Sequence, residues 1–525
     1  MSKQLQAATI AAPGFQGLNT QDSSVTLESG FALVANNCVI DKFGRIGSRK
    51  GWTTVHPTNT DLSTGLVKTI HQLRAPDNTT VLFAAGNNKL FIEEAGSLVA
   101  KNVRNAADSA DISYTISDSH WQVANIQQSG ETKAYGTVVQ AGHPVLILNY
   151  LTSAYGFQRL GDIGQLPDTY TTTTFTPNCA LAAYGRTWLA DIEGDRQTVY
   201  FSDLVDATNY KTGTAGRLNI SEVVGDGDPI IGLAAHNGFI VIFCERHIVL
   251  YSQAQDPTAL SLADTVNGIG CIARDSIQAT GSDVVFLSES GVRSVARTIQ
   301  EKSAPLKDIS KNVRDDLLVD VSVETRNNIK SIYSPLDAFY LISFPTASTV
   351  YCFDTRAALP DGALRVTTWT LAPTAFALTI NQDVYMGFAG YVGKYNEYQD
   401  NGVNYSMSYY TNYFDYQTPT QLKMLKKMDF YLIGGAGQDI TFKWDFDYTG
   451  SYYSSQIELD SSAISEYGID EYGVATYSGG IVISLVNLSA SGSGRVLQVG
   501  LESEINNNPL SVQKLDVYVK PGRIA

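Results

Sequence analysis

Cysteine, histidine and charge are all scarce in this sequence. Its 525 residues include five cysteines and six histidines, and Asp, Glu, Lys and Arg together make up only 17%. The cysteines are spread over more than 300 residues, with no C-x-x-C pair and no clustered histidine, so neither a disulfide framework nor a structural zinc site is expected. We read them as small buried hydrophobic residues and predict no cofactor. They are Cys38, Cys179, Cys244, Cys271 and Cys352.

Long apolar runs are missing as well. The longest, at 239–244 and 145–148, fall far short of the roughly 20 residues that a helix needs to cross a bilayer. The first 14 residues hold one lysine and a short Ala/Ile patch in place of the apolar core of a secretory signal. We therefore expect a soluble chain that is made in a reducing cytoplasm and inserts into no membrane.

Basic residues are outnumbered, because 37 Lys and Arg stand against 52 Asp and Glu, a net charge of −15. Proteins that read a DNA sequence take much of their affinity from Lys and Arg on the phosphates, so this class is disfavoured, although DNA nearby is not excluded. The chain is rich in glycine (44) and tyrosine (29), and 44% of it is hydrophobic. This composition excludes intrinsic disorder and argues against a coiled coil.

Strand patterns dominate the sequence, as short runs of Val, Ile, Tyr, Phe and Thr separated by Gly, Asn and Asp turns. Units of this kind begin at Leu181, Ile231 and Ile277, at offsets of 50 and 46 residues, which match the period of a four-stranded propeller blade. A generic array of β-sandwiches is the alternative. Six or seven units recur, at 69–96, 135–160, 181–204, 231–252, 276–295, 329–355 and 376–398.

These units divide the chain into three predicted parts. An extended or β segment covers 1–66, a propeller body covers 67–400 with a possible inserted segment near 100–180, and a Tyr-rich β module at 401–525 packs with the N-terminal segment. Residues 310–320 predict a short amphipathic helix behind a Ser310 cap. Residues 390–477 hold 15 of the 29 tyrosines, a composition typical of protein–protein surfaces.

Motifs of catalysis are not found. There is no phosphate-binding P-loop, no H-E-x-x-H pair and no G-x-S-x-G elbow. Residues 445–450 partly match a calcium loop, but Gln456 stands where a bidentate glutamate is needed, so a polar hairpin loop is the preferred reading. Asp226 and Asp228 form a tight acidic turn, for which a solvated loop is the plain interpretation. We predict that the protein is not an enzyme.

Two groups of basic residues stand out in the acidic chain. Their charges are either simply solvated or form docking patches for an acidic partner or for another copy of the chain. The first group is Lys42, Arg45, Arg49 and Lys50, and the second is Lys423, Lys426 and Lys427.

Several motifs, taken in order, give the chain a family resemblance. PGFQGLNT at 13–20, NNC at 36–38 and GRIGSRKGW at 44–52 resemble the N-terminus of short-tailed phage tail nozzle proteins, also called tail tubular protein B or packaged-DNA stabilisation proteins. Their order along the chain carries the resemblance, which spans about 14–369. Further matches lie at 186–189, 200–203, 206–210, 285–287, 290–292, 337–345, 350–354 and 369–370.

The resemblance implies an all-β fold with few short helices: a six-bladed β-propeller body, a β-rich platform next to the head-to-tail adaptor, to which 1–66 contributes, and a distal tip. It also implies a homohexameric ring in the virion tail, continuing the channel below the portal and adaptor. Such a ring holds the packaged genomic DNA and lets it pass at ejection. Family members commonly dock tail fibres or tailspikes, but the C-terminal third of this chain matches less clearly.

An acidic lumen would suit such a conduit, because it repels the DNA backbone and lets the polymer slide. Asp226 and Asp228 are the candidate lining residues. The alternatives are a carbohydrate-binding or glycan-hydrolysing propeller and a monomeric adaptor for peptide partners. The sialidase box S-x-D-x-G-x-T-W is absent from the sequence, although its tyrosine-rich loops would suit sugar stacking.

Overall fold

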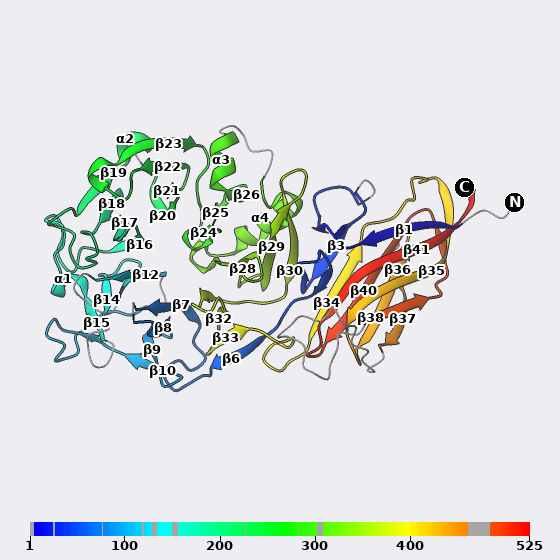
Figure 1. The fold of residues 1–525 in the computed structure, drawn as a ribbon, viewed down its shortest axis with the longest axis horizontal. Coiled ribbons are helices and arrows are strands. Elements are labelled where there is room, and N and C mark those ends of the chain that lie inside the picture. The colour runs from blue at the N-terminus through cyan, green and yellow to red at the C-terminus, as the bar shows by residue number, and fades with distance from the viewer. Residues whose placement is uncertain are drawn as a thin grey trace.

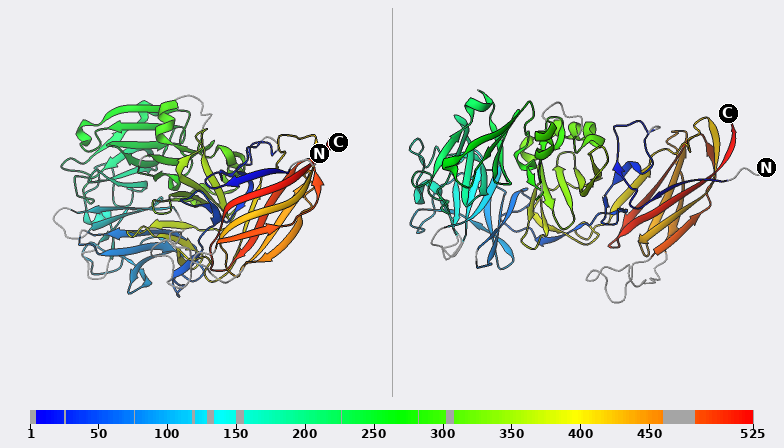
Figure 2. Two further views of the ribbon diagram at one scale, coloured as in Figure 1. Left: turned by 45° about the vertical axis from the view of Figure 1, so that its right-hand side comes forward. Right: turned by 45° about the horizontal axis from the view of Figure 1, so that its top comes forward.

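Two β-rich bodies lie one after the other along the long axis of the molecule (Figure 1). A propeller occupies one end, and a platform of long strands occupies the other, where both chain ends lie. Two further views show the same separation (Figure 2). The computed structural model describes residues 5–24, 27–75, 77–117, 120–128, 134–149, 156–225, 227–281, 283–301, 308–459 and 483–524. Within these ranges no helix is both long and apolar enough to span a membrane.

Six small sheets are arranged as a six-bladed β-propeller, which confirms the predicted fold class. The first has β7 (Val67–Arg74), β8 (Thr80–Gly86), β9 (Lys89–Glu94) and β10 (Ser97–Lys101); the second β11 (Val103–Arg104), β12 (Trp121–Gln127), β13 (Ala134–Gln140), β14 (Leu146–Asn149) and β15 (Gly156–Arg159); the third β16 (Pro177–Ala183), β17 (Arg186–Ile192), β18 (Asp195–Phe201) and β19 (Gly216–Asn219). The fourth has β20 (Ile230–His236), β21 (Phe239–Cys244), β22 (His247–Ser252) and β23 (Ser261–Asn267); the fifth β24 (Gln278–Ala279), β25 (Val284–Ser288) and β26 (Gly291–Ser294); the sixth β31 (Ala375–Leu378), β32 (Val384–Phe388), β33 (Tyr391–Tyr395) and β6 (Trp52–His56).

A seventh group of strands joins this ring to the platform. It comprises β27 (Lys330–Ser334), β28 (Phe339–Phe344), β29 (Thr349–Ala358) and β30 (Leu364–Trp369). Strand β27 contacts β24 on one side and β31 on the other, and β31 contacts β7. This group belongs to the ten-stranded sheet described below and lies in the ring between the fifth and sixth small sheets. Each of the seven repeat units in the sequence thus contains strands of the ring. The stretch near 100–180 belongs to the ring too, because its strands form the second sheet and the start of the third.

The same four strands open a ten-stranded sheet that runs on into the platform. It continues through β3 (Phe31–Asn36), β34 (Tyr405–Thr411), β40 (Leu497–Ile505), β36 (Asp439–Phe446) and β37 (Tyr453–Glu458), with β2 (Gly17–Leu18) beside β3. A second platform sheet has β38 (Ile483–Leu488), β35 (Gln421–Gly434), β41 (Leu510–Ile524), β5 (Ile46–Ser48) and β4 (Cys38–Ile40), with β1 (Gln6–Ala11) on β41 and β39 (Ser493–Gly494) on β35.

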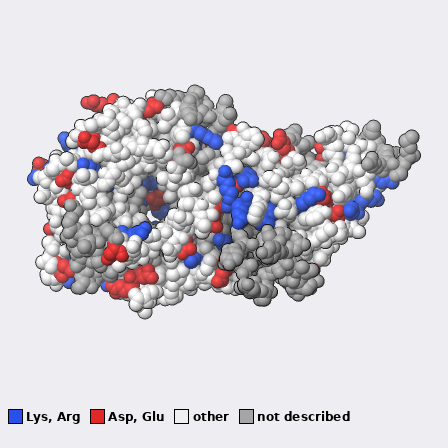
Figure 3. Space-filling model, in the orientation of Figure 1, with Lys and Arg blue, Asp and Glu red and all other residues white. Residues whose placement is uncertain are grey.

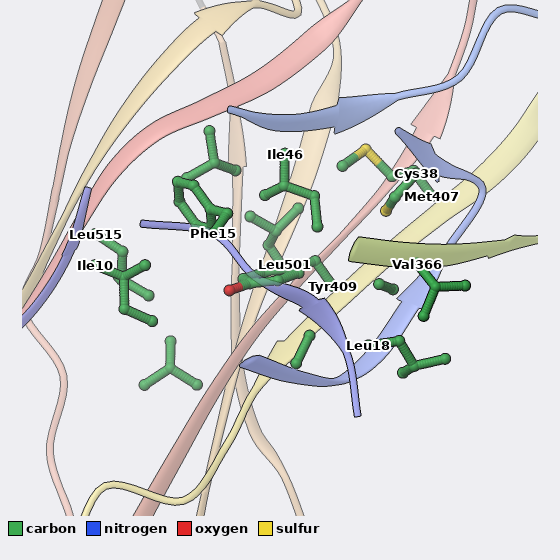
Figure 4. Close-up of a cluster of buried hydrophobic side chains, with 14 of the residues drawn as sticks. Ile10, Phe15, Leu18, Cys38, Ile46, Val366, Met407, Tyr409, Leu501 and Leu515 are labelled. Atoms are coloured by element: carbon green, nitrogen blue, oxygen red, sulfur yellow. The ribbon is translucent and has the colours of Figure 1, made fainter. Parts of the chain in front are cut away.

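Strands from the two chain ends are therefore interwoven in the platform. Strand β1 pairs antiparallel with β41 along its whole length, β5 also pairs with β41, and β3 pairs with β34. The hydrophobic core follows from this pairing (Figure 4). Phe15 and Ile46 from the N-terminal segment pack among Tyr409, Leu501 and Leu515 from the C-terminal module, all of them buried. Residues far apart in the sequence thus share one core.

Blade strands read as continuous apolar runs because neighbouring blades cover both of their faces. Five of the six residues of β21 are buried, and Phe243 packs on Phe286 of the next blade with 5.0 Å between ring centroids. Helices are short in the described ranges: α1 (Leu160–Ile163), α2 (Ser221–Val224), α3 (Val295–Glu301), α4 (Arg314–Val323), and the 3-10 turns η1 (Pro257–Ala259), η2 (Arg274–Ser276), η3 (Lys311–Val313) and η4 (Arg326–Asn328).

The helix expected at 310–320 is present as η3 followed by α4, with Val313 and Leu317 fully buried. Its predicted cap is wrong. The Ser310 hydroxyl caps no helical N–H and instead accepts the N–H of Val292 at 2.9 Å, because the end of the fifth sheet lies against this turn. Ser310 therefore fixes the position of the segment and does not start the helix.

Candidate functional site

A buried charged network crosses the propeller axis. Asp275, in η2 before the fifth sheet, lies with its carboxylate 2.8 Å from Nε2 of His120 and accepts a hydrogen bond from the ammonium of Lys330. His120 directly precedes β12 of the second sheet, which stands across the ring from the fifth, whereas Lys330 begins β27. Side chains from opposite sides of the ring therefore meet at its centre.

Arg274 completes this network. Its guanidinium donates to the backbone carbonyls of Trp121 and Asn178, in the second and third sheets, and its Nε lies 2.8 Å from the carboxylate of Asp275. Burial alone would raise the pKa of Asp275, but Arg274, His120 and Lys330 outweigh it and hold that pKa well below 3.8. The carboxylate is thus ionised at neutral pH, and it has polar contacts with Arg274, His120 and Lys330.

The neighbouring bases respond to the same burial. Desolvation, aided by the charge of Arg274, lowers the pKa of His120 to about 4, so its ring is neutral at pH 7. Desolvation also lowers the pKa of Lys330, although Asp275 opposes the shift. The network is one buried carboxylate held between two cations and a neutral imidazole. Its charges are satisfied by one another within the network.

The network also links sheets that lie on opposite sides of the ring. Its hydrogen bonds connect the second and third sheets to the turn before the fifth sheet. A hollow with acidic and basic side chains lies in the propeller on the face shown in Figure 3.

The two acidic lumen candidates have different outcomes. Asp226 lies outside the described residues. Asp228 is buried, with its carboxylate 2.5 Å from Nδ1 of His247 and accepting the N–H of Arg246 at 3.2 Å. It ties the start of β20 to the turn between β21 and β22, so its carboxylate is bound within the chain.

Arg49, predicted to be a docking residue, is completely buried. It forms two hydrogen bonds with Asp400, at 2.8 and 2.7 Å, and its guanidinium lies 4.0 Å from the ring centroid of Tyr405. The bidentate pair joins the N-terminal segment to the chain just before the C-terminal module. Arg49 thus stabilises the fold and presents no charge to a partner, which corrects the prediction.

Lys423 is also buried, contrary to the predicted second patch. Its ammonium donates to the carbonyls of Thr418 (2.7 Å) and Arg495 (2.5 Å), and desolvation lowers its pKa. Its neighbours on β35 stay nearer to solvent. Lys426 is exposed, and Lys427 lies 2.8 Å from Asp429.

Two residues of the first basic group, Lys42 and Arg45, lie at an exposed turn between β4 and β5. The charged groups of Lys42 and Arg45 lie 5.1 and 4.5 Å from the centroid of the Phe43 ring, and Phe43 is 53% exposed. Arg45 also pairs with Asp41 at 2.6 Å. Lys50 lies apart from this turn, 3.3 Å from Asp337 in the ring. Sequence reasoning found the cations here but missed the phenyl ring between them.

The N-terminal motifs have a clear structural role. Gly17 adopts φ +83°, and a Cβ there would lie 2.6 Å from the carbonyl oxygen of Val366 in β30. Gly44 adopts φ +73°, and its Cβ would meet Pro13 at 2.6 Å. Only glycine allows these approaches. Gly17 therefore lets the N-terminal segment pack closely on the sheet that ring and platform share, and Gly44 lets the segment pack on itself.

The loop that resembles a calcium site uses its carboxylates for the chain itself. Asp445 accepts the hydroxyl of Thr449 and the N–H of Gly450, and Asp447 accepts the N–H groups of Arg495 and Val496. Across the ranges described above, no group of three or more His, Cys, Asp or Glu residues is placed to hold a metal ion.

No protein-family profile matches this chain, and no curated protein sequence matches it. Similar solved structures include PorZ, a surface component of the type-IX secretion system of Porphyromonas gingivalis (14% identity, TM-score 0.35, 65% of this chain) and the extracellular domain of the one component system BT4673 of B. thetaiotaomicron (11%, 0.42, 83%). The chain covers 37% and 60% of those two chains, less than two thirds of either. The Pan2 WD40 domain of Neurospora crassa is similar at 8% identity and TM-score 0.39, over 66% of this chain and 96% of that one. Likeness at this level says nothing about activity or partners.

Proposed function

We propose that this chain is a structural subunit of a short-tailed phage tail, a nozzle that continues the DNA channel below the portal and adaptor. Six copies form a ring that retains the packaged genome and lets it pass into the host. The proposal includes no chemical reaction. It includes a side surface for tail fibres or tailspikes and a platform that faces the adaptor.

The N-terminal motifs carry this proposal. Two of the residues that resemble nozzle proteins join the N-terminal segment to distant parts of the chain: Gly17 lies against β30, and Arg49 holds Asp400. Gly44 lies on Pro13 and shapes the segment itself. A nozzle subunit needs such a rigid union, because one end is fixed to the particle while the other meets the host.

The closed propeller axis supports a conduit made from several copies. Since the Asp275 network fills the axis of each chain, duplex DNA can pass only through a lumen between chains. The net charge of −15 per chain suits that lumen, because like charge keeps the DNA backbone from adhering to the wall. Screening limits this repulsion to about 8–10 Å at physiological salt, so only residues close to the DNA contribute.

Particles assembled without this chain test the proposal. We expect their heads to fill with DNA and then lose it, so that the genome becomes sensitive to added nuclease, and we expect purified chain to restore protection. A matched sample with Glu222→Lys, at an exposed position on α2 that belongs to neither predicted docking patch, should restore it equally. Particles that keep their genome and infect normally without the chain would rule out the nozzle role.

A further inference from the structure

An open groove lies where the ring meets the platform. It has a volume of about 380 Å³ between helix α4 and strands β3, β29 and β30. Its apolar walls include Val319, which is 62% exposed, and Val34, which is 37% exposed. A valine exposed to that extent on a helix is stabilised when a partner covers it.

The groove is also acidic. Asp316 and Asp320 lie among its lining residues, and no lysine or arginine does. The hydroxyl of Tyr351 donates to Asp320 at 2.9 Å, which leaves the more exposed Asp316 toward the opening. A suitable occupant is therefore apolar and carries positive charge beside its apolar group.

The turn between β4 and β5 has this combination. Phe43 projects with Lys42 and Arg45 beside its ring, and none of the three lines the groove. The turn is held in place, because the carboxylate of Asp41 accepts the N–H groups of Phe43 and Arg45. An aromatic side chain on a rigid turn is an effective anchor, since it loses little conformational entropy on binding.

We propose that the Phe43 turn of one copy inserts into the α4 groove of the next copy. This inference rests on the proposed ring and names its contact. Phe43 covers Val319 and Val34, and Lys42 approaches Asp316. The contact joins two different surfaces, so copies assemble head to tail, the arrangement that closes into a ring.

Paired variants of the full-length chain test this contact by mass photometry. Phe43→Ser removes the anchor, and Val319→Arg fills the groove with bulk and like charge to the turn. We expect each to weaken assembly on the order of 100-fold, as for a central anchor residue, with an unchanged thermal midpoint because both positions are exposed. Glu222→Lys, at an exposed position on α2, serves as the surface control and should assemble like the unchanged protein.

A mixing experiment separates this geometry from a general loss of assembly. The Phe43→Ser chain keeps an unaltered groove, and the Val319→Arg chain keeps an unaltered turn. The turn of the second can bind the groove of the first, but the two altered surfaces cannot bind further, so an equimolar mixture should give dimers and nothing larger. A charge exchange gives a second check: Lys42→Glu should weaken assembly, and adding Asp316→Lys to the same chain should restore it.

The outcomes distinguish this inference from the proposed function. A ring that forms normally with both Phe43→Ser and Val319→Arg overturns the contact and leaves the nozzle proposal standing. A mixture of the two variants that stays monomeric also overturns it. An unchanged chain that forms no ring, alone or with its adaptor, contradicts the nozzle proposal itself.

Discussion

Several charged side chains of this protein lie inside it and hold distant segments together. Arg49 connects the N-terminal segment to Asp400, and Asp275 connects the second sheet to the fifth and to β27. Removing one partner from such a pair leaves the other charge buried and unpaired, which costs far more than losing a pair at the surface.

Arg49→Met tests this at the N-terminal joint. The substitution leaves the Asp400 carboxylate without its bidentate partner, so we expect the free energy of unfolding to fall by about 3–5 kcal/mol. Urea unfolding followed by tryptophan fluorescence measures it. Lys426→Met, at an exposed position, should change stability by no more than about 0.5 kcal/mol. Equal effects of the two substitutions would show that Arg49 acts as a surface residue.

Two histidines make stability depend on pH. Burial lowers the pKa of His71 to about 4, and burial with Arg274 does the same for His120. The unfolded chain takes up these protons near pH 6.5, so stability is complete above pH 6.5 and falls as the pH drops toward 4, by at most about 1.4 kcal/mol per pH unit for each histidine. Urea unfolding midpoints at pH 7, 6 and 5 measure the slope.

His71→Phe isolates one of these contributions. It keeps a ring of similar size on β7 and removes the titrating nitrogen, so the midpoint should depend less steeply on pH between 6.5 and 4.5. An unchanged slope would mean that His71 takes up its proton as readily in the folded protein as in the unfolded chain.

At the scale of single elements, the pairing of β1 with β41 attaches the N-terminal strand to the platform. Ile10 is buried in register with Leu515, whereas Ala7 on the same strand is exposed. Strand β1 lies at the edge of its sheet, so its attachment depends on the few side chains that it buries.

Ile10→Ala should loosen this strand. We expect a loss of about 2–4 kcal/mol in the free energy of unfolding and faster amide exchange at Leu515 and its neighbours in β41, while the propeller amides keep their protection. Hydrogen exchange with mass spectrometry reads both regions at once. Ala7→Ser is the matched control, and it should leave exchange in β41 unchanged.

Elements with a strong local period could be predicted from the sequence. All seven repeat units contain strands of the ring, because alternating apolar runs and glycine turns set strands and hairpins locally. The Ser310 cap could not be predicted, since a hydrogen bond from Val292, in a neighbouring sheet, competes for the same hydroxyl.

Charged residues could not be assigned to surface or interior in the same way. Arg49 meets Asp400 across 351 positions, and His120 meets Asp275 across 155. No nearby residue signals either partner. The exposure of Phe43 could have been predicted from the sequence. It stands in a turn between Lys42 and Gly44, where a buried phenyl ring is unusual.

At the scale of the whole molecule, the closed propeller axis and the interwoven platform lead to one arrangement. A single chain offers no path for duplex DNA along its propeller axis. The nozzle account therefore requires a lumen between chains, with the propellers of the several chains arranged around it. The composition fits such a subunit, because low charge and abundant tyrosine suit surfaces that copies and partners cover.

Particle imaging of the purified chain, alone and with its adaptor, tests the central claim most directly. The account predicts a closed ring whose central channel is wide enough for duplex DNA and is bounded by several chains, with each propeller axis displaced from the channel axis. A single compact particle under both conditions, or a channel that coincides with the axis of one propeller, would contradict it.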